Sequence, residues 1–341
     1  MARRKAAQKG SAADPTDRGL VCAFLLQGDG RARPVGWKEI HSWKADTGPL
    51  WIHLNRADSA AQDWLRKHCG IDPVIAEALI VAETRPRSLV TEAGMLVSLR
   101  GINFNPGADP EDMIAMRMFV EPQRIITTRT RRLMAVDDLR QQFDAGRGPK
   151  TASDCFLALA QSLIGRVSSV LDDLDESADD LEEELLKPGG AQRHLRDRLT
   201  TLRQRTIAIR RYMAPQREAL AKIADSTAKQ NLMDGNDVAI LRELADQNTR
   251  AVEELDTIRE RASVIQDELI NRLSDRLNRN SYVLTIIAAL VLPLTVVTGL
   301  LGVNVGGMDT GEAGPGFVQL CWILGGVVLA EFVLFKLLRW I

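Results

Sequence analysis

The feature that most constrains this chain is a stretch near its C-terminus, Ser281–Met308, that contains no Asp, Glu, Lys or Arg. A helix rises about 1.5 Å per residue, so a helix of this length can cross a lipid bilayer. The core helices of soluble proteins rarely contain so long a run without a charge. We therefore predict a membrane span, although a net charge of −1 and 45% hydrophobic residues make the chain look soluble on average.

Polar and small side chains recur along this span at helical spacing. At about 100° per residue they fall on one side of the helix, while Leu, Ile and Val occupy the other faces. Small residues favour tight helix packing, whereas hydroxyls and an amide favour a wet surface. In a symmetric ring of identical helices both readings hold, which makes the span a candidate pore wall. We define the pore stripe as Asn278, Ser281, Leu284, Thr285, Ala288, Leu292, Thr295 and Gly299.

The pore stripe leads to Gly302-Val303-Asn304, where the span leaves the membrane. Glycine exposes backbone carbonyls and Asn304 adds a neutral amide oxygen, so a ring of these groups could hold a hydrated metal cation. Such a tripeptide more often simply ends a helix. Its position strengthens the ion-site interpretation, in which Asn304 contacts the metal, because the next loop carries Asp309 and Glu312 and no basic residue.

A second apolar segment runs from Phe317 to Leu338 and predicts a two-span hairpin. Basic residues flank the spans at their common end, namely Arg272, Arg276, Arg279, Lys336 and Arg339. By the positive-inside rule both chain termini are expected in the cytoplasm. The membrane that holds the hairpin is expected to be a bacterial inner membrane. Glu331 is the one acid inside either span. It could be a proton-linked carboxylate, but its nearness to the cytoplasmic end favours an interfacial or interhelical contact.

The N-terminal part reads as a basic disordered tail, residues 1–18, followed by a cytoplasmic α/β domain, residues 19–150. Strand-like runs alternate with the helical patterns Ser59–His68 and Pro73–Glu83, which indicates a mixed sheet. The five predicted strands are Leu20–Leu26, Leu50–Leu54, Met95–Ile102, Met113–Val120 and Arg124–Thr128.

This domain contains few sequence features that indicate a catalytic or metal-binding site. Its histidines His41, His53 and His68 share no metal-ligand spacing, and no phosphate loop or catalytic motif occurs. We therefore expect no enzymatic activity and no resident cofactor. No uniformly basic face indicates nucleic-acid binding. The four cysteines stand far apart, which favours reduced thiols over disulfides or a structural zinc site.

Residues 151–280 read as a helical hairpin and a long stalk, before a transmembrane domain at 281–341. Ser153–Leu186 is predicted as one helix with an acidic second half, and an Arg-rich helix covers about Gln192–Lys222. Interhelical ion pairs are the favoured explanation. The alternative is that free carboxylates concentrate cations near a pore. After a predicted loop, Met233–Asp237, neither Gly nor Pro occurs from Val238 to Leu292, so stalk and first span form one helix, with a possible bend at Pro293.

The membrane segment resembles the CorA family of divalent-cation transporters. The resemblance is carried by Thr298–Asn304 with Pro293, and by Val305-Gly306-Gly307, which is similar to the ZntB zinc-transporter branch. Val303 stands where CorA relatives have Met, which argues against magnesium specificity without establishing zinc. Other stretches are also similar to that branch: Trp51–Asn55, Glu83–Arg87, Arg100–Asn103 and Arg211–Arg217.

The resemblance implies an α+β membrane protein with a cytoplasmic mixed α/β domain, a long stalk and a two-helix transmembrane hairpin. It implies a homopentamer in the lipid bilayer, whose first span lines the pore, that transports a divalent cation, foremost Zn²⁺. Direction and proton coupling stay open. Two alternatives remain at this point: a magnesium or cobalt channel of the CorA type, and a membrane-anchored cytoplasmic sensor whose spans only assemble it.

Overall fold

The computed structural model describes residues 18–82, 85–187, 192–230, 233–300 and 315–337. The chain divides into two compact units, Met1–Ile265 and Gln266–Ile341, and each is described by itself. The first unit holds a sheet with its covering helices, and the second consists of the end of one long helix and a further helix. The boundary falls inside the long helix, α8 (Gly235–Leu300).

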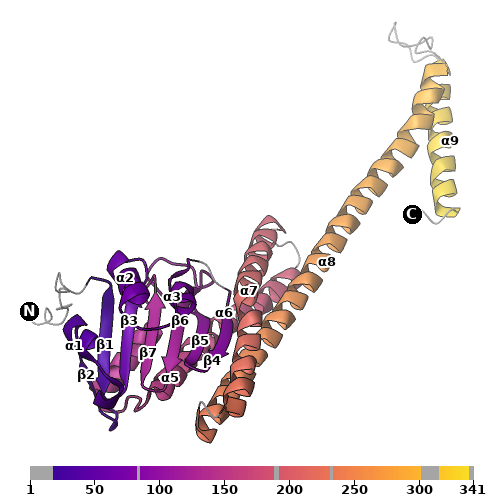
Figure 1. Ribbon diagram of the computed structural model, residues 1–341. Coiled ribbons are helices and arrows are strands. Elements are labelled where there is room, and N and C mark those ends of the chain that lie inside the picture. Colours follow the sequence, from indigo (N-terminus) through magenta and orange to yellow (C-terminus); the bar gives the residue numbers. More distant parts are fainter. Residues whose placement is uncertain (1–17, 83–84, 188–191, 231–232, 301–314, 338–341) are drawn as a thin grey trace, which may run out of the picture. The chain divides into compact units, whose positions relative to one another are not determined.

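A seven-stranded mixed sheet forms the centre of the first unit, in the order β2-β1-β3-β7-β6-β5-β4 (Figure 1). The strands are β1 (Leu20–Leu26), β2 (Ala32–Pro34), β3 (Leu50–Asn55), β4 (Arg87–Thr91), β5 (Gly94–Gly101), β6 (Ile114–Glu121) and β7 (Arg124–Arg129). Only β3 and β7 pair in parallel among these strands. The mixed sheet and its five predicted strands are confirmed. The two strands that sequence reasoning missed, β2 and β4, are the edge strands, which are short and polar as edges usually are.

Helices cover both faces of this sheet. On one face lie α1 (Trp37–Ser42), α2 (Ser59–Lys67) and α3 (Pro73–Ile80), and on the other lie α4 (Met134–Asp144) and α5 (Ala152–Gly165). A 3₁₀ turn, η1 (Ala45–Thr47), precedes β3. The two predicted helices begin at caps, because Asp58 accepts a hydrogen bond from Ala60 N and Asp72 accepts one from Val74 N. Pro73 follows Asp72 at the first helical position, where its missing N–H costs nothing.

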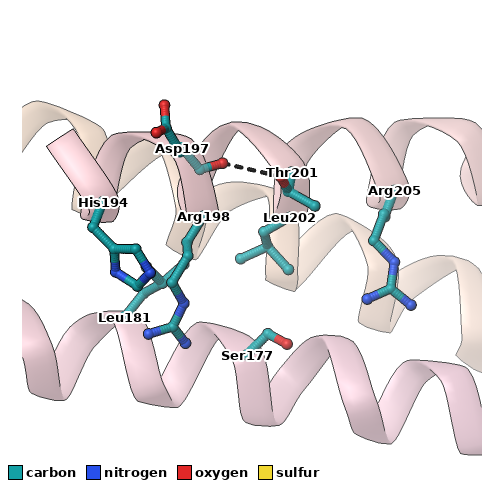
Figure 2. A pocket seen from close by; sticks show the side chains of 8 residues that line it. All are labelled: Ser177, Leu181, His194, Asp197, Arg198, Thr201, Leu202 and Arg205. Atoms are coloured by element: carbon teal, nitrogen blue, oxygen red, sulfur yellow. Dashed lines mark hydrogen bonds between the residues drawn. The ribbon is translucent and has the colours of Figure 1, made fainter.

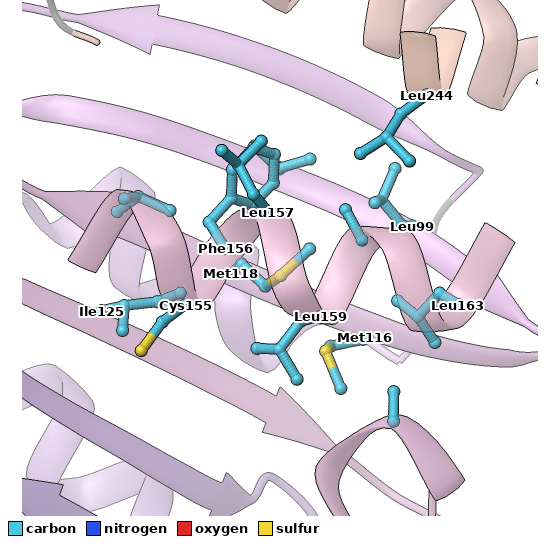
Figure 3. Packing of buried hydrophobic residues seen from close by; sticks show 14 of the residues in the cluster. Leu99, Met116, Met118, Ile125, Cys155, Phe156, Leu157, Leu159, Leu163 and Leu244 are labelled. Carbon is cyan, nitrogen blue, oxygen red and sulfur yellow. The ribbon is translucent and has the colours of Figure 1, made fainter. Parts of the chain in front are cut away.

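Alternation along the central strands builds the two hydrophobic layers. In β5, Met95, Val97 and Leu99 belong to the cluster that contains α5, while Leu96 belongs to the cluster on the α2–α3 side. Figure 3 shows how Phe156, Leu159 and Leu163 of α5 lie against Met116 and Met118 of β6. These side chains are almost fully buried, so the sheet and α5 form the most solvent-shielded part of the unit. Burial on this scale is the main source of stability for such a domain.

Three long helices complete the first unit: α6 (Ser168–Leu186), α7 (Gln192–Gln230) and the first part of α8. The prediction of one helix over 153–186 was wrong, because a turn at Arg166 and Val167 separates α5 from α6. Arg166 holds the carboxylate of Asp138 on α4 at 2.6 Å, and Val167 is buried, so tertiary contacts stabilise the turn. Helix α8 begins at Gly235, inside the predicted loop, because Asp234 accepts a hydrogen bond from Asp237 N at 2.7 Å.

An apolar series with a spacing near 3.6 residues runs along the first part of α8. Its members from Leu241 to Leu269 are buried. Asn248, the one polar member, is also fully buried, and it donates from Nδ2 to Met213 O at 2.8 Å. Gln216 donates to Asn248 Oδ1 at 3.3 Å and accepts from Arg100 N at 2.7 Å, so one amide network ties α8, α7 and β5 together.

Candidate functional site

Helix α8 is long and apolar enough to cross a membrane, and so is the segment Ala152–Leu186. The two differ in burial, since 56% of the apolar window is buried in the latter and 0% in α8. Ala152–Leu186, which contains α5 and α6, is therefore a core segment of the first unit. The apolar part of α8 instead presents its side chains outward. In the second unit it is accompanied by α9 (Pro315–Leu337), which carries only two charged residues, Glu331 and Lys336.

One face of the membrane part of α8 is partly covered within the second unit. The half-buried residues recur every three or four positions: Ile286, Ala289, Leu290, Pro293, Leu294, Val297 and Thr298. In α9 the residues with reduced exposure also share one face: Leu324, Val327, Glu331 and Phe335. Figure 1 shows α9 alongside the last turns of α8. We assign these two faces to the contact between the helices of the hairpin.

The pore stripe lies on the opposite side of α8. All eight of its residues are exposed, and its two leucines, Leu284 and Leu292, are each 68% exposed. By helix geometry the centre of the pore stripe lies roughly 150° from the centre of the α9-facing side. Helix α9 therefore leaves this polar and small-residue surface uncovered. A surface that faces an ion path or identical helices in an oligomer must be uncovered in a single copy of the chain.

The two threonine hydroxyls of the pore stripe are held by the helix itself. Thr285 Oγ1 donates to Ser281 O at 2.8 Å, and Thr295 Oγ1 donates to Val291 O at 2.8 Å. Each hydroxyl hydrogen is thus used within the helix, which fixes the oxygen and leaves its acceptor capacity directed away from the backbone. Such oxygens can contact a hydrated cation. Thr298 makes the same kind of bond, to Leu294 O at 2.9 Å, but it lies on the α9-facing side.

The remaining predicted site residues lie outside the described residues. These are the selectivity tripeptide Gly302, Val303 and Asn304, and the loop acids Asp309 and Glu312. Their assignment stays a prediction. Within the described residues no group of three or more His, Cys, Asp or Glu is arranged to hold a metal ion. The oxygen-bearing side chains of the pore stripe are those of Asn278, Ser281, Thr285 and Thr295.

The acidic half of α6 is bound by ion pairs to two other helices. Arg261 of α8 donates to Asp175 at 2.6 Å and Glu182 at 2.9 Å, and it also pairs with Asp179. The hydrogen bond to Glu182, followed by that to Asp179, raises the pKa of Arg261. Sequence reasoning missed this arginine because it lies on a helix far along the chain, where no local pattern connects it to α6.

The predicted ion pairing between α6 and α7 is confirmed at Arg198, which binds Glu184 at 2.8 Å and Asp180 at 3.1 Å. Beside it a groove of about 270 Å³ runs between the two helices (Figure 2). Its lining residues are Ser177, Leu181, His194, Asp197, Arg198, Thr201, Leu202 and Arg205. Two other arginines of α7 bind elsewhere, because Arg205 reaches Glu111 at 3.4 Å and Arg210 reaches Asp256 at 2.6 Å. Many of the α6 carboxylates therefore serve to hold helices together.

Packing explains His53, whereas His41 and His68 are exposed. His53 is fully buried on β3, where its Nδ1 lies 2.7 Å from Thr127 Oγ1. Burial lowers the pKa of His53, with nearby Arg129 and Arg140 adding to the effect, so the ring is neutral at physiological pH. The rings of His41 and His68 lie 6.1 Å apart, a neighbourhood that their positions in the sequence do not reveal.

Known proteins resemble the chain over nearly its whole length. The model of the family described as "CorA-like Mg2+ transporter protein" matches residues 46–338. The divalent cation transporter CmaX of Pseudomonas aeruginosa is 40% identical over 95% of this chain and 98% of its own. The zinc transport protein ZntB of Pectobacterium atrosepticum is 34% identical over 91% of this chain and 93% of its own.

A solved structure agrees with these sequence matches. The structure of the full-length CmaX protein superposes with a TM-score of 0.82 at 39% identity and covers 95% of this chain and 99% of its own. The mixed sheet, the long helices and the apolar hairpin are thus the parts of one family architecture. The chain belongs to the CorA-like family of transporters.

Proposed function

We propose that this chain transports divalent metal cations across a membrane, through a pore lined by the membrane part of α8. One observation carries the proposal: the eight residues of the pore stripe are all exposed, on the side of α8 opposite the half-buried face. A lone membrane anchor has no need of such a surface, since leucine on every side would serve it equally well. The names of the relatives, a divalent cation transporter and a zinc transport protein, support the same activity.

Transport requires several copies, because two helices cannot enclose a path for an ion. We propose a homopentamer, as the CorA resemblance implies, in which five pore stripes face a common axis. Thr285, Thr295 and Ser281 would offer oxygens to the hydrated ion, and Leu292 would narrow the path. Asn304 and Gly302 would form the outer selectivity ring. The second span, α9, would lie outside the first.

We further propose that Zn²⁺ is the main cargo. Val303 in place of Met and the trailing Val305-Gly306-Gly307 support this choice, as does the likeness to ZntB proteins. Mg²⁺ and Co²⁺ are the competing cargoes, since the family name itself refers to magnesium. The hairpin would lie in a bacterial inner membrane with both chain termini in the cytoplasm. The part before residue 281, that is a domain at 19–150 and a stalk at 151–280, would then be cytoplasmic.

The decisive experiment is metal uptake into proteoliposomes that contain only this chain. We expect Zn²⁺ to enter faster than Co²⁺ and Mg²⁺, followed with a fluorescent indicator sealed inside the vesicles. Protein-free vesicles and an Asn304→Ala protein of equal assembly state are the controls. A preference for Mg²⁺ would contradict the zinc assignment alone. The absence of any divalent flux would contradict transport and favour the sensor.

A further inference from the structure

The carboxyl group of Glu331 is enclosed within the hairpin of the second unit. Glu331 lies on the face of α9 that also carries Leu324, Val327 and Phe335, the face that we assign to the contact with α8. Both of its carboxyl oxygens are shielded from solvent, and neither has a hydrogen-bond partner among the described residues. The residue as a whole is only half-buried, so the polar end of its side chain is the enclosed part.

This orientation is the reverse of the one that a charged side chain near a membrane surface commonly adopts. Helix α9 ends at Leu337, six residues after Glu331, which is about 9 Å by helix rise. Long charged side chains so close to the end of a span extend toward water. Glu331 instead keeps its carboxyl group between the two helices, where an ionised carboxylate is strongly unfavourable unless it is paired.

No charged group faces this carboxyl from the described parts of the two helices. The residues of α8 that face α9, from Ile286 to Thr298, contain no acid and no base. Lys336 lies five positions after Glu331, and therefore about 140° around α9. The titratable residues that flank the two contacting faces in the sequence are all exposed, and none of them bonds to Glu331: Arg279, Tyr282, Cys321 and Lys336.

We propose that Glu331 is a proton-binding site, whose neutral carboxylic acid lets α9 pack against α8 and whose ionisation loosens this contact. A neutral acid can be enclosed between apolar side chains at a much smaller cost than a carboxylate. Once the proton is lost, the carboxylate must reach water, which requires the helices to separate at this level. The inference concerns the hairpin itself, so it holds whether or not the chain transports metal.

The first test labels protonated carboxyl groups in the full-length protein, reconstituted into lipid vesicles. Dicyclohexylcarbodiimide is a hydrophobic reagent that reacts with protonated carboxyl groups in apolar surroundings, and mass spectrometry locates the adduct. We expect labelling of Glu331 that falls severalfold as the pH is raised from about 6 to about 9, because ionisation removes the reactive form. Asp275, an exposed acid of α8, is the control and should stay unlabelled. Equal labelling of Glu331 at both pH values, or none, would overturn the proposal.

The second test follows the contact between the helices. In a protein without its native cysteines, Val327→Cys places a thiol one turn before Glu331 on the same face of α9. Its reaction with a small hydrophilic thiol reagent should speed up with pH more steeply than in the same protein carrying Glu331→Gln, which keeps a neutral group of the same shape. We expect the ratio of the two rates to rise at least about threefold between about pH 6 and about pH 9, since the pH dependence of the thiol itself cancels. A ratio that stays constant would contradict the loosening.

An ionised Glu331 paired with a basic group is the competing arrangement. Arg339 lies eight residues after Glu331 and outside the described residues, so it needs its own variant. If Arg339 supplied the counter-charge, wild-type Glu331 would resist the carbodiimide at every pH, and Arg339→Gln would make it reactive. That outcome would refute the proton site. The proposal expects Arg339→Gln to leave the labelling of Glu331 unchanged, as should Lys336→Gln, the matched control on the exposed side of α9.

Discussion

Leu292 shows how much one side chain can decide in this protein. It belongs to the pore stripe, is 68% exposed and has no polar atom, so a ring of such residues would exclude water from a narrow path. We expect Leu292→Ser to raise the basal leak of divalent cations severalfold without changing assembly. The matched control is Ile287→Ser, because Ile287 is 52% exposed and lies about 140° away on the same helix. Equal leak in both variants would mean that Leu292 forms no constriction.

Asn304 is the second residue on which transport should depend. Its amide would stand at the outer end of the pore stripe, where a ring of amide oxygens can replace part of the ion's hydration shell. Asn304→Ala should reduce divalent cation uptake at least about tenfold in a correctly assembled protein. Asn280→Ala removes an exposed amide of α8 outside the pore stripe and should leave uptake near the wild-type level. Wild-type flux and selectivity in Asn304→Ala would remove this residue from the mechanism.

At the scale of one element, the two faces of α8 can be told apart by chemistry. After replacement of the native cysteines, a cysteine at Thr285, Ala288 or Thr295 should react with a small hydrophilic thiol reagent in the membrane. A cysteine at Ile286 or Val297 should not, because both positions are half-buried on the α9-facing side. If the pore stripe were a dry packing surface, its cysteines would be unreactive in a transport-competent protein.

The start of α8 carries a pH-sensitive carboxyl. Asp237 is 7% exposed, and burial raises its pKa to about 6, with the charges of Asp234 and Asp154 adding to the effect. Its contribution to stability is therefore full below pH 4 and is lost as the pH rises through about 6. Asp237→Asn should be more stable than the wild type at pH 7.5, by about 1–2 kcal/mol, and similar to it at about pH 3.5, below the unfolded pKa. Unfolding curves across this range test the change, with the exposed Asp225→Asn as control, and a constant offset at all pH values would contradict it.

Elements with a strong local pattern were predictable. The apolar runs of β3, β5 and β6 and the caps of α2 and α3 all have a local cause, and the sequence predicted them. The edge strands were missed because β2 and β4 are short and polar. The break between α5 and α6 was missed because its stabilising contact, Arg166 with Asp138, is tertiary. The same reason hides the ion pairs of Arg261 with α6. The grouping of the pore-stripe residues on one face of α8 could be predicted, because it follows from helical spacing alone.

At the scale of the whole molecule, charge predicts how the chain crosses the membrane. Arginines precede the membrane part of α8, Lys336 and Arg339 end the second span, and the segment between the spans carries only Asp309 and Glu312. Basic residues flanking a span are retained on the cytoplasmic side. A cysteine at Asp309 should therefore react with an impermeant thiol reagent in intact cells, whereas tags at Met1 and Ile341 should be detected only after the cells are opened.

This topology also bears on the transport proposal. With both termini inside, the pore stripe would run from a cytoplasmic end at Asn278 toward an outer end at Asn304, and the sheet domain would meet only cytoplasmic ligands. The control is a cysteine at Asp225, an exposed position of the first unit, which should be labelled only in opened cells. Labelling of Asp225 or of either terminus in intact cells would invert or break the hairpin, and Asn304 could then no longer stand at the outer mouth.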